Sequence, residues 1–225
     1  MDVTFDLLFL ALCVYLIGSI PFGFILTKIF AKQDIRSIGS GHTGATNVLR
    51  SGKKWLAALT LFLDLNKGWY AMRVGEDMMP PPFRAHYFDD TPESILAMFA
   101  VIAIATLGHC FPIWLKFKGG KGAIVGLGML LIIPYTGLAA CMSWLGAAII
   151  TRYSCVSALI AFLFATFVTF FIYGPPSAAI CALLTLLIWI RHKDNFKRLF
   201  KGEEPKIGQK NNPRQEEDAS EPVSK

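Results

Sequence analysis

Long apolar runs separated by short polar connectors dominate the chain. The runs at 7–27 and 95–115 contain no Asp, Glu, Lys or Arg, and a helix of about 20 apolar residues spans the hydrocarbon core of a bilayer. Further apolar helices are expected at 55–72, 123–133, 135–151, 157–173 and 177–190. The pattern predicts an all-α, polytopic membrane bundle of seven transmembrane helices, with five as the alternative if the short runs between 123 and 173 pair into fewer crossings.

Proline and glycine mark the breaks in this pattern. Gly18-Ser-Ile-Pro21 predicts a kink in the first helix, and Gly174-Pro-Pro separates the last two helices, because proline removes a backbone donor. From residue 205 the chain is polar and lacks aromatic residues, which is typical of disorder. We expect one integral membrane domain over 1–204 and a disordered polar tail over 205–225.

The charges in the connectors predict an orientation. Lys and Arg outnumber acids five to one in the connector 31–54, and the loop 116–122 and the segment 191–201 are also rich in Lys and Arg. The connector 73–93 instead has two basic residues against five acids. By the positive-inside rule the basic segments are cytoplasmic and 73–93 lies outside. The N-terminus is then expected outside and the C-terminus in the cytoplasm, which requires an odd number of crossings.

Composition excludes several classes of protein. The chain is 54% hydrophobic and 17% charged, with a mean hydropathy of +0.48, which is too apolar for an ordinary soluble domain. The net charge of +6 reflects loop placement in a membrane protein, so no nucleic-acid partner is expected. The five cysteines are scattered and form no C-x-x-C pair, so neither disulfides nor a metal site is expected.

The first basic connector contains DIRSIGSGHTGATNVLRSG over 34–52. Its residues 39–44 match G-x-G-x-x-G, but a membrane helix precedes them, so a dinucleotide-binding turn is rejected. Small residues, hydroxyl groups, Arg36 and Arg50 remain, and arginine can bind phosphate oxygens in pairs. From the residues alone, a phosphate site and a flexible, helix-capping connector remain equally open.

The second basic segment is GHCFPIWLKFKGGKGAIVG over 108–126. It lacks the nucleotide P-loop pattern G-x-x-x-x-G-K-[ST]. Gly119, Gly120 and Gly122 precede an expected helix N-terminus beside Lys121, which is an arrangement that binds simple anions. A positive-inside anchor, or close helix packing at Gly122 and Gly126, explains the same residues.

The third basic segment is RHKDNFKRLFKGEE over 191–204. Basic residues with Leu199 and Phe200 suit a stretch lying on anionic lipid. His192 and Asn195 are also three residues apart, which places them on one face of a helix. That face points to the membrane side where the other basic segments are expected, so the three segments can converge on one cytoplasmic site.

Together these segments resemble the bacterial membrane glycerol-3-phosphate acyltransferases that use acyl phosphate, the PlsY family. The strings GSIPFG, DIRSIGSGHTGATNVLR, FLDLNKG, GHCFPIWLKFKGGKG and RHKDNFKRLFKGEE occur in the family order, from Gly18 to about Glu204. Two departures are His42, where asparagine is expected, and Ala-Ile-Val at 123–125, where Val-Ala-Thr is usual. They put affinity in doubt but leave the charged and glycine positions unchanged.

The resemblance implies a seven-helix bacterial inner-membrane enzyme of phospholipid biosynthesis with its active site facing the cytoplasm. The implied reaction transfers an acyl group from acyl phosphate to the sn-1 hydroxyl of glycerol 3-phosphate, giving lysophosphatidic acid and phosphate without a cofactor. A soluble enzyme would supply the acyl phosphate. By position, the implied catalytic set is Ser40, Arg50, Lys121, His192 and Asn195, and the implied substrate-binding set is Thr46, Asn47, Gly119, Gly120 and Gly122.

The residues agree with this chemistry. Both substrates carry phosphate, and the acyl donor carries a lipid chain, so a cationic site at the membrane surface suits them. An acyl phosphate has a good leaving group, so positioning and charge stabilisation can suffice. None of the four histidines is followed by Asp five residues on, so the His-x-x-x-x-Asp dyad is absent. Either His192 or, as we prefer, the substrate phosphate takes the proton, with His192 and Asn195 then binding and orienting phosphate.

Two other classes of protein fit parts of the pattern. A small transporter of a phosphorylated solute would place its site near the midplane on broken helices, whereas the polar motifs here gather at one face. A non-enzymatic scaffold would leave the phosphate-binding residues unexplained. Asp64 and Lys67 lie inside the second helix, where charges are functional by default, but their spacing favours a mutual structural pair.

Overall fold

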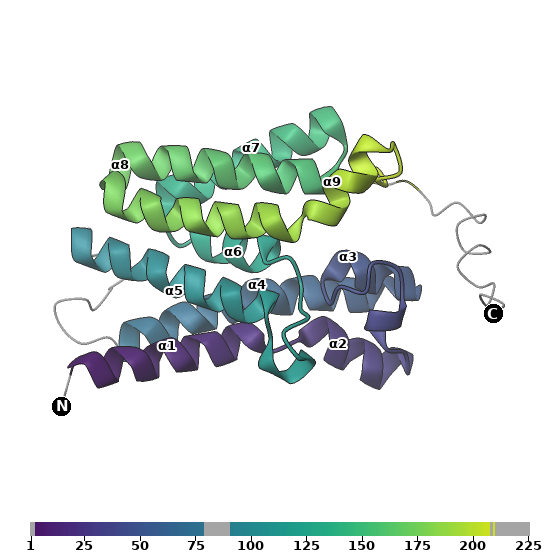
Figure 1. The fold of residues 1–225 in the computed structure, drawn as a ribbon, viewed down its shortest axis with the longest axis horizontal. Helices are drawn as coiled ribbons and strands as arrows, with labels where there is room; N and C mark the ends of the chain where they lie inside the picture. The colour runs from purple at the N-terminus through teal and green to yellow at the C-terminus, as the bar shows by residue number, and fades with distance from the viewer. Residues whose placement is uncertain (1–2, 79–90, 208, 210–225) are drawn as a thin grey trace.

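The computed structural model describes residues 3–78, 91–207 and 209, and these residues form a bundle of helices without a β-strand (Figure 1). The main helices are α1 (Val3–Ser19), α2 (Phe22–Leu26), α3 (Ala45–Val48), α4 (Lys54–Met78), α5 (Pro92–Cys110), α6 (Ala123–Leu130), α7 (Pro134–Thr151), α8 (Ser154–Arg191) and α9 (Lys193–Phe200). Short turns of other helix types are η1 (Thr27–Ala31), η2 (Ile35–Ser37), η3 (Leu49–Ser51) and η4 (Ile113–Leu115).

Each of the seven expected apolar runs contains a helix. Within the described part of the chain, three stretches are long and apolar enough to cross a membrane: Thr4–Ala31, Pro92–Leu115 and Ser154–Arg191. The all-α fold is confirmed. The seven crossings and the orientation of the termini remain predictions.

Helix α8 is a hairpin of two arms. At Gly174 the backbone takes φ 80° and ψ 175°, and two prolines follow directly, so the helix cannot continue straight. The Oγ1 atoms of Thr166 and Thr185 lie 2.8 Å apart between the arms. The break predicted at this position is therefore confirmed, and it returns the chain to the end of the bundle where α8 began (Figure 1).

The predicted kink near Pro21 is also present, since α1 ends at Ser19 and α2 begins at Phe22. The expectation of a helix reaching Leu115 is wrong, because α5 ends at Cys110. Pro112 lacks an N–H group and disfavours helical geometry in the preceding residue, Phe111. The hydroxyl of Tyr15 donates to the Phe111 carbonyl at 2.6 Å, which satisfies a backbone group freed by this break.

The second expected helix is longer than predicted, because α4 runs without interruption from Lys54 to Met78. Asp64 and Lys67 lie inside it, with side chains only 4% and 2% exposed, and Lys67 Nζ is 3.0 Å from Asp64 Oδ1. Lys67 Nζ also donates to the carbonyl of Ile20 at 3.0 Å. The expected mutual pair is therefore present, and it ties α4 to the break between α1 and α2.

Two apolar clusters hold the bundle together. The larger one joins most of the long helices, and its fully buried members include Val14, Phe99, Met129 and Phe162. The smaller one packs Leu26, Ile35, Val48, Leu56 and Ala57 together. This smaller cluster packs the connector 31–54 against α2 and the start of α4. A segment rich in polar residues therefore has a defined position in the fold.

The polar segments gather at one end of the bundle. Figure 1 shows the start of α1 and the bend of α8 at one end, and α2, α3 and α9 at the other. The prediction of a disordered tail over 205–225 lies mostly outside the described residues. Its first part is placed: Ile207 N donates to the Arg152 carbonyl at 2.6 Å, and Lys206 Nζ lies 5.7 Å from the centre of the Tyr153 ring.

Candidate active site

The three polar segments meet around a cavity of about 180 Å³ at this end of the bundle. All five residues expected to be catalytic line it: Ser40, Arg50, Lys121, His192 and Asn195. Of the expected substrate-binding residues, Thr46, Asn47 and Gly122 line it as well. Residues far apart in the sequence thus form one site, as expected. Gly119 lines a neighbouring, more open cavity of about 640 Å³.

Asn47 organises the first segment. Its side-chain oxygen accepts a hydrogen bond from Ser40 N at 3.1 Å. Its amide nitrogen donates to the carbonyls of Ile35, Ile38 and His42 at 3.1, 3.0 and 2.9 Å. Only 3% of Asn47 is exposed, and both polar atoms of its side chain bond to the loop. Asn47 therefore positions Ser40, and its expected role in binding substrate stays a prediction.

The glycine loop differs from the simple anion cradle expected from its sequence. Gly119 N and Gly120 N donate to the carbonyls of Cys110 and His109 at 3.2 and 3.1 Å, so these two N–H groups are not available to phosphate. A Cβ atom at Gly120 would overlap the His109 ring, so only glycine fits at this position. The expected role of Gly119 and Gly120 as phosphate donors is not supported by this geometry.

Gly122 fits the expectation better. It caps the N-terminus of α6 with a left-handed backbone, φ 83°, which L-residues with side chains rarely adopt. It lines the cavity directly after Lys121. The positive end of the α6 dipole and the Lys121 ammonium therefore lie together beside the cavity.

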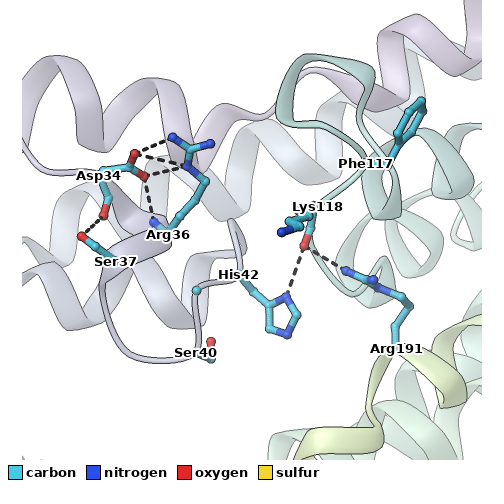
Figure 2. Close-up of a pocket in the computed structure, with 10 residues that line it drawn as sticks. Asp34, Arg36, Ser37, Ser40, His42, Phe117, Lys118 and Arg191 are labelled. Carbon is cyan, nitrogen blue, oxygen red and sulfur yellow. Dashed lines mark hydrogen bonds and ion pairs between the residues drawn. The ribbon is translucent and has the colours of Figure 1, made fainter. Parts of the chain in front are cut away.

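Two side chains hold the glycine loop by its carbonyl groups. Arg191 donates through Nη2 to Gly119 O at 3.0 Å, and through Nη2 and Nε to Gly120 O at 2.8 and 3.1 Å. His42 Nδ1 donates to the same Gly119 carbonyl at 3.2 Å. Figure 2 shows the two side chains approaching it from the connector and from the end of α8. The loop preceding Lys121 is thus fixed by the other two segments.

The third segment contributes a bend with two buried polar residues. His192 lies between α8 and α9, and its Nδ1 atom donates to the Ile188 carbonyl at 2.7 Å. Asn195 Nδ2 donates to Glu204 Oε1 at 2.6 Å, and Arg198 Nε donates to Glu204 Oε2 at 2.8 Å. Glu204 therefore ties the segment after α9 back to two residues of α9 that line the cavity.

Burial shifts the pKa values of the cavity residues in the directions that favour their neutral forms. Burial lowers the pKa of Lys121 to about 8, with Glu204 opposing this shift. Burial lowers the pKa of His192 to about 4, although its bond to the Ile188 carbonyl raises it. His192 is therefore neutral at pH 7. Because its Nδ1 carries the hydrogen, its Nε2 is a hydrogen-bond acceptor.

The same effect acts on Arg50 and His42. Burial, together with the nearby charge of Arg198, lowers the pKa of Arg50, although arginine stays charged at any physiological pH. Burial and the charge of Lys121 lower the pKa of His42. At neutral pH, Lys121 and Arg50 are therefore cationic donors of the cavity, and His42 and His192 are neutral.

A buried cluster lies behind the glycine loop. Lys67 Nζ is 2.8 Å from His109 Nδ1, and His109 packs against Gly120. Asp64 completes the cluster and lines the cavity. The cluster connects α4, the end of α5 and the loop. Asp64 and Lys67 therefore support the position of the loop as well as the packing of the bundle.

The lining of the cavity is partly apolar. It includes Leu61 of α4, Ile124 of α6, Trp144 of α7 and Ala158 of α8. Leu61 is 38% exposed, and lipid tails are expected around a membrane protein. The site therefore combines a cationic part with an apolar part that can accept a hydrocarbon chain.

Residues 3–78, 91–207 and 209 contain no group of three or more His, Cys, Asp or Glu that could hold a metal ion. The cationic donors described above provide a different means of binding anions. The expectation that the reaction needs no cofactor stays a prediction.

Comparison with known proteins decides the family. Residues 8–202 match the family described as glycerol-3-phosphate acyltransferase. The chain belongs to this family. Members of the glycerol-3-phosphate acyltransferase family include a Rhodospirillum rubrum protein of that name, which is 47% identical over 201 residues, covering 89% of this chain and 90% of the relative. Another, from Rhodopseudomonas palustris strain HaA2, is 48% identical over 198 residues, covering 87% and 93%.

Solved structures of the glycerol-3-phosphate acyltransferase family agree. Two crystal structures of PlsY, an integral membrane glycerol 3-phosphate acyltransferase, superpose with TM-scores of 0.75 and 0.72 at 32% and 31% identity. Both comparisons cover 89% of this chain and 95% of the PlsY chain. One is its glycerol 3-phosphate form and the other its lysophosphatidic acid form. The chain is thus an integral membrane acyltransferase, as the sequence motifs indicated.

The family motifs also contain residues whose importance the sequence did not reveal. Arg191, Arg198 and Glu204 all lie within the quoted segment 191–204, yet nothing in their spacing distinguishes them from a basic membrane anchor. Their roles depend on partners in other segments or on the bend after α9. The packing of His109 against Gly120 has no sequence signal.

Proposed function

We propose that this acyltransferase transfers an acyl group from acyl phosphate to the sn-1 hydroxyl of glycerol 3-phosphate, releasing 1-acylglycerol 3-phosphate and inorganic phosphate. The observation that carries the proposal is the single cavity shared by Arg50, Lys121 and His192, whose lining also includes apolar side chains. Such a site suits two phosphate-bearing substrates, one of which has a lipid tail.

The cavity suggests how the substrates lie. Arg50 and Lys121 bind phosphate oxygens through charge-assisted hydrogen bonds. The acyl chain lies along Leu61, Ile124 and Trp144 toward the lipid. This arrangement brings the acyl carbonyl close to the glycerol hydroxyl, and such positioning can supply much of the rate acceleration.

The chemistry then needs one displacement. The glycerol hydroxyl oxygen attacks the acyl carbonyl carbon, and the bond from this carbon to the phosphate oxygen breaks as the phosphate leaves. Lys121 and Arg50 stabilise the negative charge on the departing phosphate. We assign the hydroxyl proton to a substrate phosphate, with His192 accepting a hydrogen bond rather than binding phosphate as the sequence had suggested.

The cellular setting is part of the proposal. Seven crossings, with the N-terminus outside and the C-terminus in the cytoplasm, place the active site on the cytoplasmic face of the bacterial inner membrane. Glycerol 3-phosphate is then available from the cytoplasm, and a soluble enzyme can deliver acyl phosphate by transient contact. The catalytic domain is residues 1–204, and 205–225 is the cytoplasmic tail.

One assay tests the function. Purified protein is mixed with palmitoyl phosphate and glycerol 3-phosphate without coenzyme A, and we expect lysophosphatidic acid and phosphate in equal amounts. Lys121→Met and Arg50→Met, which remove the cationic donors, are expected to lose at least about a hundredfold in kcat/KM. Uptake of glycerol 3-phosphate into vesicles without product formation would instead indicate a transporter.

A further inference from the structure

The side-chain amide of Asn195 has one buried atom that no described residue satisfies. Asn195 is 6% exposed and contributes to the cavity wall. Its Nδ2 atom donates to Glu204 Oε1 at 2.6 Å. Its Oδ1 atom is buried and has no hydrogen-bond partner among the described residues. Leaving such an acceptor unpaired is unfavourable, so a ligand group that donates a hydrogen bond would be stabilised there.

The network around Glu204 fixes which amide atom is left free. Glu204 also accepts a hydrogen bond from Arg198 Nε at 2.8 Å. Glu204 pairs with this cation as an acceptor, and a carboxylate can only accept hydrogen bonds. The nitrogen of Asn195 must therefore face Glu204. The reverse orientation would place two acceptor oxygens against each other, so Oδ1 is the atom left for a ligand.

The free atom is an acceptor, which limits the ligand group that it can bind. A phosphate monoester near neutral pH is largely ionised and offers acceptor oxygens, which would repel Oδ1. The two hydroxyl groups of glycerol 3-phosphate are its only other polar groups, and each can donate. The phosphate-orienting role that the sequence suggested for Asn195 is therefore replaced by a hydroxyl-binding role.

The chemistry distinguishes the two hydroxyls. The sn-1 hydroxyl loses its proton during acylation, so it needs a partner that tolerates this loss. The sn-2 hydroxyl keeps its proton throughout, and a neutral amide oxygen is a suitable permanent acceptor for it. His192 Nε2 has no hydrogen to donate and remains available as an acceptor for the reacting hydroxyl.

We propose that Asn195 Oδ1 recognises the sn-2 hydroxyl of glycerol 3-phosphate, so that Asn195, oriented by Glu204, makes the enzyme select a polyol phosphate over a simple hydroxyalkyl phosphate. This inference rests on the function proposed above. It assigns Asn195 to acceptor specificity rather than to the transfer step.

The test compares two acceptors that differ only in this hydroxyl. Glycerol 3-phosphate and 3-hydroxypropyl phosphate, which lacks the sn-2 hydroxyl, are each assayed with palmitoyl phosphate. The wild-type enzyme is expected to prefer glycerol 3-phosphate at least about tenfold in kcat/KM, because the analogue leaves Oδ1 unpaired. In Asn195→Ala this preference is expected to fall below about threefold, mainly through a loss with glycerol 3-phosphate. Lys197→Gln, an exposed position of the same helix, is expected to keep the wild-type preference.

The outcomes separate the possible roles of Asn195. A wild-type enzyme that uses both acceptors equally well overturns the inference, and this measurement needs no variant to fold. An equal loss with both acceptors in Asn195→Ala also overturns it, because a structural, phosphate-binding or reacting-hydroxyl role would affect both. Turnover of neither acceptor by the wild-type enzyme overturns the proposed function itself.

Discussion

Individual side chains in this cavity divide into donors and acceptors. Lys121 and Arg50 supply positive charge, and Gly122 places the N-terminus of α6 beside them. His192 and Asn195 present the acceptor atoms Nε2 and Oδ1, because His192 Nδ1 donates to the Ile188 carbonyl and Asn195 Nδ2 faces Glu204. A molecule with a phosphate at one end and hydroxyls at the other matches this division.

The pH dependence of turnover should report on Lys121. Burial lowers its pKa to about 8, and the protonated form binds phosphate. In the free enzyme this charge is present below pH 8 and is lost as the pH rises through that value. We therefore expect kcat/KM for glycerol 3-phosphate to fall above about pH 8, since kcat/KM reports ionisations of the free enzyme.

Lys121→Arg provides the matched variant for this prediction. Arginine stays charged beyond pH 12, so the decline near pH 8 should disappear even if overall activity is lower. The measurement is the initial rate from pH 6 to 10, corrected for spontaneous hydrolysis of the acyl phosphate. An unchanged alkaline decline in Lys121→Arg would assign the ionisation to another group.

At the scale of elements, the glycine loop is held in position by hydrogen bonds to other segments. Its residues 118–122 belong to no helix, so its shape depends on partners in other segments. The end of α5 accepts the N–H groups of Gly119 and Gly120. Arg191 at the end of α8 and His42 in the connector donate to its carbonyls. A substitution at the end of α8 should therefore alter the position of Lys121.

Arg191→Lys tests this connection. Lysine keeps the charge but cannot donate to two carbonyls in the geometry of a guanidinium group. We expect KM for glycerol 3-phosphate to rise about five- to fiftyfold, with a smaller effect on kcat, because at least one charge-assisted bond is lost. Hydrogen exchange at the amides of Gly119 and Gly120 should become faster.

The exposed Lys197 again provides the control, since Lys197→Gln should change neither KM nor exchange. Wild-type values of both quantities in Arg191→Lys would show that the loop holds its shape without this guanidinium group. A general loss of thermal stability with equal acceleration of exchange throughout the bundle would indicate a structural role only.

At the scale of the whole molecule, the three polar segments that form the site lie at one end of an apolar bundle. The hairpin of α8 and the start of α1 lie at the opposite end (Figure 1). Exposed aromatic residues such as Phe164, Phe167 and Phe171 cover the outside of α8, as expected for a surface in contact with lipid. This asymmetry is what an enzyme at a membrane–water boundary requires.

The orientation can be tested with single cysteines. In a variant without its five native cysteines, Glu93→Cys is expected to react with a membrane-impermeant maleimide in intact spheroplasts. Lys201→Cys is expected to react only after the membrane is permeabilised, because the basic segment 191–201 should be cytoplasmic. Both positions are exposed in the structure. The opposite labelling pattern would reverse the proposed topology and separate the site from cytoplasmic glycerol 3-phosphate.

The amino-acid pattern was sufficient to predict the helices, their breaks at Pro21 and Gly174, and the three segments that carry the chemistry. These features depend on local physics: apolar length, missing backbone donors and charges of one sign along a short stretch. The resemblance to a family then indicated which residues would meet, and the cavity brings together all five that were expected to be catalytic.

Only the tertiary structure decided what each polar atom faces. The N–H groups of Gly119 and Gly120 donate to carbonyls at the end of α5, and the Asn47 side chain bonds to its own loop. Glu204 orients the Asn195 amide so that its oxygen is left without a partner within the part of the chain that the structure describes. A hydrogen bond depends on distance and direction between groups that are distant in the chain. Sequence can therefore indicate that a residue belongs to a site, whereas the partners supplied by folding determine whether it donates, accepts or supports.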